Sequence, residues 1–134
     1  MTRPRALVPL AIGVVVLTLT LAACTGDDVE TGKVAGKAGG KAAADATVVD
    51  VDASNFEFGP GTIKVDATEE VALTLHSKDG PHDFAVDGLG LVADVGGGRT
   101  DTQRLRIDTP GRYTFFCTLP GHRDGGMEGT IVVR

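Results

Sequence analysis

The chain has 134 residues, of which 13 are basic and 18 acidic, and its formal net charge is −5. This length allows one domain with a core large enough to fold without help. The acidic balance argues against nucleic acid as a partner, because a surface that binds phosphates needs an excess of lysine and arginine.

The first residues have the layout of a secretory signal peptide. Arg3 and Arg5 precede an apolar run from Leu7 to Leu21 that ends in small residues. The run is shorter than the roughly 20 residues that a helix needs to cross the hydrocarbon core, so a retained transmembrane anchor is the weaker interpretation. We predict a signal peptide over residues 1–23.

The segment Leu21-Ala22-Ala23-Cys24 resembles the lipobox of bacterial lipoproteins, in which cleavage leaves the cysteine as an acylated N-terminus. The resemblance implies a lipid on Cys24 and attachment to the outer face of a bacterial membrane, in the cell envelope or periplasm. An ordinary secretory site with an unmodified Cys24 is the alternative. Cleavage removes two of the 13 basic residues, and the formal net charge becomes −7.

Cysteine usage points to a metal. If Cys24 is lipidated, Cys117 has no cysteine left with which to form a disulfide. A free thiol outside the cytoplasm is open to oxidation unless something occupies it, and a metal ion is the obvious occupant.

The segment after Cys24 has the composition of a linker. Up to about Ala46 it consists largely of glycine, alanine, lysine and aspartate, with hardly a large apolar side chain. Such a segment cannot bury enough surface to offset the entropy lost on ordering. We expect residues 24–46 to be a flexible tether and residues 47–134 to be the folded domain.

The folded part shows a two-residue period of apolar side chains, which is typical of strands. Turn signals such as Gly59-Pro60-Gly61 and Pro110-Gly111 separate these segments. The pattern predicts an all-β, two-sheet antiparallel sandwich. Its expected inward-facing residues include Val71, Leu73, Leu75, Phe84, Val86, Leu105, Ile107, Tyr113, Phe115, Ile131 and Val133.

Three candidate metal ligands follow the strand that ends at Phe116. Cys117, His122 and Met127 are spaced Cys-x4-His-x4-Met, with turn-forming residues in both intervals. A thiolate, imidazole nitrogens and a weak thioether suit both oxidation states of copper, whereas calcium and magnesium prefer oxygen. The spacing therefore favours a copper site with one further ligand from another part of the chain.

Strand parity nominates His82 as that ligand. His82 shares its parity with Phe84 and Val86, so it should point into the sandwich, and Pro81 places it at the end of a strand. His76 is the competing histidine, but it alternates with buried positions and should face solvent.

The segments Tyr113-Thr-Phe-Phe-Cys117-Thr-Leu-Pro-Gly-His122, Met127 and Gly129-Thr-Ile-Val-Val resemble the C-terminal ligand loop of the cupredoxins. Pro81-His82-Asp83-Phe84 is similar to the upstream ligand segment of that family. The resemblance implies a Greek-key β-sandwich with one type 1 copper ion. His82 and His122 would bind through imidazole, Cys117 through thiolate, and Met127 as a long axial ligand, with His122 as the electron port.

Two positions depart from the family pattern. The loop between His122 and Met127 is one residue longer than in azurins, which bears on the axial bond. Asp83 stands where the family often has an asparagine that ties the ligand loops together, and an ionised carboxylate there would repel the thiolate. We expect Asp83, Phe84, Phe115 and Phe116 to surround the ligands.

Other interpretations of these residues remain open. Cys117 could be an inert core thiol, Met127 a filler of the sandwich end, and either histidine a surface residue. All four would then have to fall by accident in family order.

These features predict a carrier of single electrons that docks with redox partners at a membrane and does not act as an enzyme. The acidic balance suggests a partner with a basic docking patch. One alternative is a protein that holds copper for delivery to another protein, and a second is a copper-free interaction module with the same fold.

Overall fold

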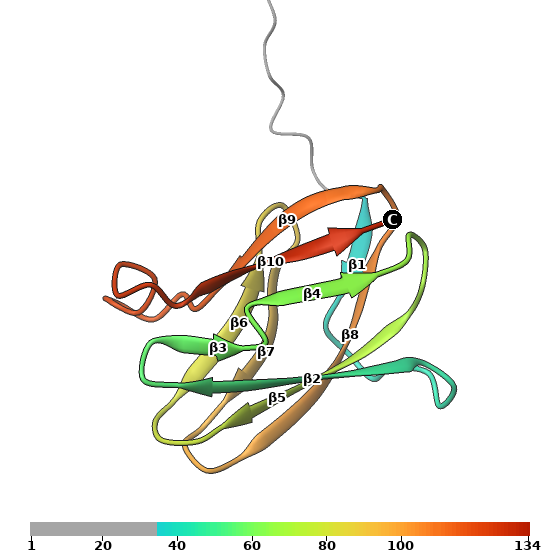
Figure 1. Cartoon of the computed structure of the whole chain (residues 1–134). Helices are drawn as coiled ribbons and strands as arrows, with labels where there is room; N and C mark the ends of the chain where they lie inside the picture. Colours follow the sequence, from blue (N-terminus) through green and yellow to red (C-terminus); the bar gives the residue numbers. More distant parts are fainter. Residues whose placement is uncertain (1–34) are drawn as a thin grey trace, which may run out of the picture.

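The computed structural model describes residues 35–134 as ten strands in two five-stranded sheets (Figure 1). The first sheet has the order β1 (Gly36–Ala38), β8 (Thr100–Ile107), β5 (Val71–Ser77), β2 (Thr47–Ser54) and β3 (Glu57–Gly59). The second has the order β4 (Thr62–Val65), β10 (Glu128–Val133), β9 (Gly111–Phe116), β6 (His82–Val86) and β7 (Gly90–Val95). Within these residues no helix is long and apolar enough to cross a membrane.

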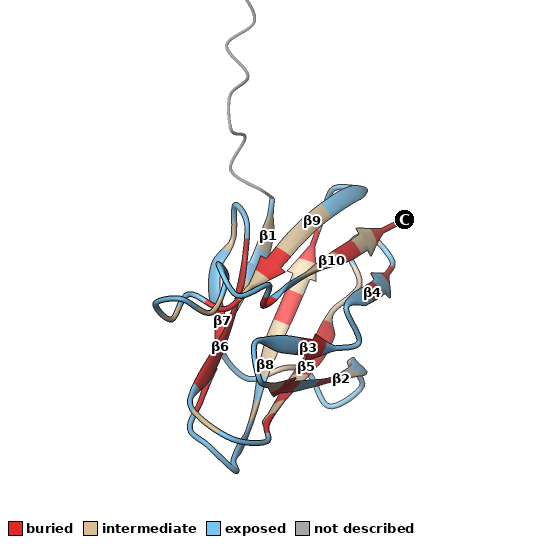
Figure 2. Cartoon of the chain, turned by 60° about the vertical axis from the view of Figure 1, so that its left-hand side comes forward, coloured by how far each residue is buried: buried red, intermediate tan, exposed pale blue. Residues whose placement is uncertain are grey.

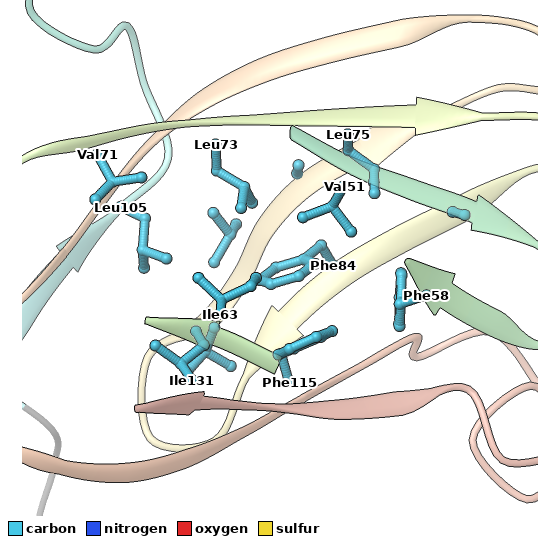
Figure 3. Close-up of a cluster of buried hydrophobic side chains, with 14 of the residues drawn as sticks. Val51, Phe58, Ile63, Val71, Leu73, Leu75, Phe84, Leu105, Phe115 and Ile131 are labelled. Atoms are coloured by element: carbon cyan, nitrogen blue, oxygen red, sulfur yellow. The ribbon is translucent and has the colours of Figure 1, made fainter. Parts of the chain in front are cut away.

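The core lies between the sheets and is built from the alternating positions of their strands. Figure 3 shows side chains such as Leu73 and Ile131, from opposite sheets, turned toward one another. Phe84 and Phe115 stack with ring centroids 4.6 Å apart. Burying each large apolar side chain stabilises the fold by about 1.5–3 kcal/mol relative to leaving it exposed. The predicted all-β, two-sheet class is confirmed.

The pairing is not purely antiparallel. β2 pairs with β5, and β4 with β10, in parallel, while the remaining pairings are antiparallel. The parallel pair β2 and β5 arises because the chain leaves the first sheet after β3, adds β4 to the second sheet and then returns. An expectation based on short turns misses such crossovers, because alternation within a strand says nothing about the direction of its neighbour.

A short strand precedes Thr47, the predicted start of the folded domain. Gly36–Ala38 forms the edge strand β1 against β8, and beyond it the amide of Gly39 donates to the carbonyl of Arg104. An edge strand is held by backbone hydrogen bonds, so it needs few large apolar side chains. The lack of such side chains is the reason that the sequence predicts a tether here. Gly36 also lies so close to β8 that an added Cβ would be 2.3 Å from the carbonyl oxygen of Arg106.

The predicted signal peptide over residues 1–23, Cys24 and the first part of the predicted tether lie outside the described residues.

Strands β6 and β9 bring the candidate ligands to one end of the second sheet. They pair with each other only at Ala85 with Phe116 and at Val86 with Phe115. The start of β6 and the segment after β9 are therefore not hydrogen-bonded to each other as strands. Figure 2 shows β6 buried along its whole length. The space between these two strand ends is where His82 and Cys117 meet.

Candidate metal centre

His82 is the first residue of β6 and is 4% exposed. Its Nε2 atom lies 2.8 Å from Oδ1 of Asp79. A carboxylate can only accept a hydrogen bond, so Nε2 carries the proton and the lone pair is on Nδ1. Nδ1 is buried and has no hydrogen-bond partner, which leaves it free to bind a metal ion.

Asp79 holds His82 from within the same turn. Its carboxylate also accepts hydrogen bonds from the amides of Gly80 and Asn55, each at 2.8 Å. The hydrogen bond from His82, followed by those from the two amides, lowers the pKa of Asp79 to about 2. Asp79 is therefore an anion at neutral pH.

The loop from Cys117 to Met127 is closed by its own backbone. The amide of Cys117 donates to the carbonyl of Met127 at 3.1 Å, and that of Met127 to the carbonyl of His122 at 3.0 Å. The amide of His122 in turn donates to the carbonyl of Leu119 at 3.1 Å. The bond between Cys117 and Met127 extends the ladder of β9 and β10 by one residue pair, and the other two bonds close the loop between them.

The three strongest predicted ligands meet at one point. One ligand atom from each of His82, Cys117 and His122 lies within 4.8 Å of the others. Sγ of Cys117 is 3.4 Å from Nδ1 of His122, and the two imidazole centroids are 5.2 Å apart. Nδ1 of His122 thus faces the thiol, and Nδ1 of His82 has no hydrogen-bond partner.

Met127 is fully buried at the same end of the sandwich. Its backbone bonds to Cys117 and His122 place it directly beside the other candidate ligands. Axial ligation by its sulfur stays a prediction.

Asp83 is buried and turned toward the ligand loop. Oδ1 accepts from the amide of Thr118 at 2.6 Å, and Oδ2 accepts from the hydroxyl of the same residue. The carboxylate thus joins β6 to the ligand loop, the tie that the family resemblance assigns to an asparagine.

Cys117 is a fully buried thiol. Burial raises its pKa, the amides of Asp83 and Leu119 lower it, and the charge of the Asp83 carboxylate raises it. A thiol that holds its proton in the metal-free protein must release that proton when it binds a metal.

The aromatic residues around the ligands differ in position. Phe84 and Phe115 are fully buried, and Phe58 meets both edge-on. Phe116 is only partly buried, and the Arg123 guanidinium lies 3.8 Å from the centre of its ring. Phe84 and Phe115 therefore belong to the apolar core, whereas Phe116 lies under a charged side chain at the surface.

His76 lies away from the cluster. Its ring nitrogens contact Thr100 at 2.9 Å and Asp50 at 3.1 Å on the outer face of the first sheet. Its partly exposed side chain agrees with the outward orientation expected from strand parity.

Three contributors to the site were not predicted. They are Asp79, Thr118 and Phe56, whose ring meets His122 edge-on with centroids 4.9 Å apart. Asp79 stands three residues before His82 in a turn segment, and a carboxylate at that distance was a signal that could have been used. Phe56 carried no such signal, because its contact depends on the packing of two distant loops.

A cavity of about 350 Å³ opens beside the two histidines. Its lining comes from the β2–β3 turn, the turn before β6 and the ligand loop, namely Asn55, Phe56, Asp79, Gly80, Pro81, His82 and His122. His122 is the more exposed of the two imidazoles.

The donor set fits copper. Two imidazoles and one thiolate, with a thioether close by, are the ligands of type 1 copper sites. The buried Nδ1 of His82 without a hydrogen-bond partner is the observation that a bound metal ion would account for.

Comparisons with known proteins agree with this fold. A plastocyanin of Dryopteris crassirhizoma is 31% identical over 97 residues, which cover 62% of this chain and 93% of that protein. The auracyanin B structure aligns with a TM-score of 0.63 at 20% identity, over 72% of this chain and 96% of that one. A chain of a heme-copper terminal oxidase dimer aligns with a TM-score of 0.56 at 23% identity, over 73% and 72%. The family model of the cupredoxin-like domain matches residues 11–133, so this chain belongs to the cupredoxin-like family.

Proposed function

We propose that this protein carries single electrons by means of one type 1 copper ion held by His82, Cys117, His122 and Met127. The observation that carries the proposal is that ligand atoms of His82, Cys117 and His122 lie within 4.8 Å of one another, while Nδ1 of His82 is buried without a hydrogen-bond partner. When bound, copper supplies a centre that cycles between Cu(II) and Cu(I).

The protein's own part is to hold the ligands still. Asp79 orients His82, Asp83 ties β6 to Thr118, and the loop backbone fixes Cys117 relative to Met127. Ligands held in this way change little between the two oxidation states, which favours fast electron exchange. The buried aromatic rings behind them keep water out.

His122 is the proposed port for electrons. It borders the cavity together with the half-exposed Phe56, whereas His82 and Cys117 are buried. A redox partner that docks over this end comes closest to the copper through His122. The acidic balance of the chain favours a partner with a basic patch, since complementary charge speeds the encounter.

The proposal places the domain outside the cytoplasm, attached to a membrane by a lipid on Cys24. Support comes from the sequence alone: the apolar run before Cys24 and the small residues in front of it. Metabolic labelling with a fatty acid tests the anchor. Label on the wild type and none on Cys24→Ser is the expected result, and an unlabelled wild type would contradict it.

We propose no enzymatic role. The whole chain has only three histidines, of which His76 is engaged on the outer face of the first sheet. A second metal centre of the kind that copper enzymes use has no histidines left to build it.

The experiment is addition of Cu(II) to the domain, followed by visible spectroscopy and voltammetry. An intense charge-transfer band with reversible reduction is expected. Rapid loss of copper to an apoprotein without reversible reduction would favour copper delivery instead, and no binding would leave a copper-free module.

A pair of variants makes the test specific. Cys117→Ser should abolish the band, because the charge transfer arises from the thiolate. His76→Ala should leave it unchanged, since this side chain bonds Asp50 and Thr100 away from the site. Loss of the band in His76→Ala would mean that the ligand set is wrong.

A further inference from the structure

The carboxylate of Asp79 contacts three separate groups at the cavity edge. Oδ1 lies 2.8 Å from Nε2 of His82 and 2.8 Å from the amide of Gly80. Oδ2 lies 2.8 Å from the amide of Asn55, in the turn between β2 and β3. One side chain therefore joins a candidate ligand to a turn 24 residues earlier in the chain.

The turn that Asp79 holds has an unusual backbone. Asn55 and Phe56 have φ angles of 43° and 64°. Asparagine tolerates this left-handed region, but it is costly for phenylalanine and persists only where the surroundings impose it. The hydrogen bond from Asn55 to Asp79 is a contact that can impose it.

The reason for this backbone lies in what Phe56 touches. Its ring meets His122 edge-on at 80° and 4.9 Å, while remaining 49% exposed. Gly125 makes room for the ring, because an added Cβ there would lie 3.1 Å from its Cγ. The β2–β3 turn and the loop between β9 and β10 lie at the same end of the molecule (Figure 1).

We propose that Asp79 is a positioning residue for both histidines: Oδ1 orients His82 directly, and Oδ2 holds the Asn55–Phe56 turn that packs against His122. The functional importance of this positioning rests on the proposed copper site. The positioning itself is a property of the chain and is present without the metal.

The test uses imidazole ¹⁵N NMR of the metal-free protein. In the wild type, His82 should show a single Nε2–H tautomer, as the contact with a carboxylate requires. In Asp79→Ala, His82 should become a mixture of tautomers, and the ring signals of His122 should shift as well. Phe56→Ala should shift His122 and leave the tautomer of His82 unchanged.

Asp50→Ala is the matched control. It removes a carboxylate from Nε2 of His76, a similar contact on a histidine outside the site. It should alter the signals of His76 and leave His82 and His122 as in the wild type. Asp79→Asn keeps one oxygen acceptor and should fall between the wild type and Asp79→Ala, which guards against a variant that fails to fold.

Copper affinity provides the second measurement. Competition with a Cu(I) chelator should show a loss of roughly 10–100-fold in Asp79→Ala, the usual cost of removing a partner of a metal-binding histidine. Asp50→Ala should bind as the wild type does.

The outcomes separate the possible failures. A loss of stability in Asp79→Ala with unchanged tautomer and affinity would mean that Asp79 only caps a turn, and would overturn the inference. A change at His82 without one at His122 would overturn the link between them. A wild type that binds no copper would overturn the proposed function, while the NMR spectra of the metal-free protein would still decide whether Asp79 positions both rings.

Discussion

A buried imidazole nitrogen without a partner costs about 1–3 kcal/mol, and Nδ1 of His82 is such an atom. The protein tolerates that cost at the point where Cys117 and His122 also turn their ligand atoms inward. Two carboxylates hold these residues in place: Asp79 accepts a hydrogen bond from His82, and Asp83 accepts one from Thr118, the residue after Cys117. The carboxylates of Asp79 and Asp83 thus flank a site that would hold a cation.

Asp83→Asn tests the charge at this scale. The amide oxygen of asparagine can still accept from Thr118, but the negative charge beside Cys117 is lost. Because a negative charge stabilises Cu(II) more than Cu(I), the copper potential should rise, and the pKa of the Cys117 thiol should fall in the metal-free protein. Voltammetry and the ultraviolet absorbance of the thiolate measure the two effects.

Asp50→Asn, on the outer face of the first sheet, is the control for a general loss of negative charge. An unchanged or lower potential in Asp83→Asn would contradict the prediction.

Among the strands, the ends of β6 and β9 position the candidate ligands, and pairing with β10 holds the loop that carries three of them. Strand periodicity predicted the elements themselves because alternation is a local property of the chain. It did not predict β1, whose three residues are held to β8 through backbone groups that every sequence has.

Gly129→Ala tests the fit of β10 over the core. An added Cβ would lie 2.3 Å from the ring of Phe115 and 2.6 Å from the carbonyl oxygen of Gly61. Overpacking of this kind should lower the free energy of unfolding by about 1–3 kcal/mol, measured by urea denaturation of the metal-free domain. Gly96→Ala, whose new Cβ would make an ordinary 3.7 Å contact with Arg99, is the control and should change little.

Truncation tests the contribution of residues 35–46. A chain that begins at Thr47 lacks the ladder with β8 and the hydrogen bonds of Gly39 and Gly40 with Arg104. At about 0.5–1.5 kcal/mol for each bond, the two bonds with Arg104 alone contribute about 1–3 kcal/mol, and the loss relative to a chain that begins at Ala35 should be larger because the ladder is lost as well. The exposed edge of β8 should also promote self-association, visible by light scattering. Equal stability of the two chains would show that β1 is dispensable.

For the whole molecule, the metal site and the fold are linked by mass action. A ligand that binds only the folded state stabilises it by about 4 kcal/mol at a concentration about 1,000-fold above its dissociation constant. Copper should therefore raise the thermal midpoint of the wild-type domain and leave that of Cys117→Ser unchanged. A similar rise in both proteins would indicate nonspecific binding.

Strand parity and the spacing within one loop were enough to predict the two-sheet β class and to nominate His82, Cys117 and His122 as candidate ligands. The edge strand β1, the parallel pairs and the contacts of Asp79 and Phe56 became visible in the folded chain alone. The difference lies in the sequence separation over which each kind of interaction acts. Periodicity and loop spacing act over a few residues, whereas the contacts around the histidines join turns that are distant in the chain and meet only when the two sheets pack.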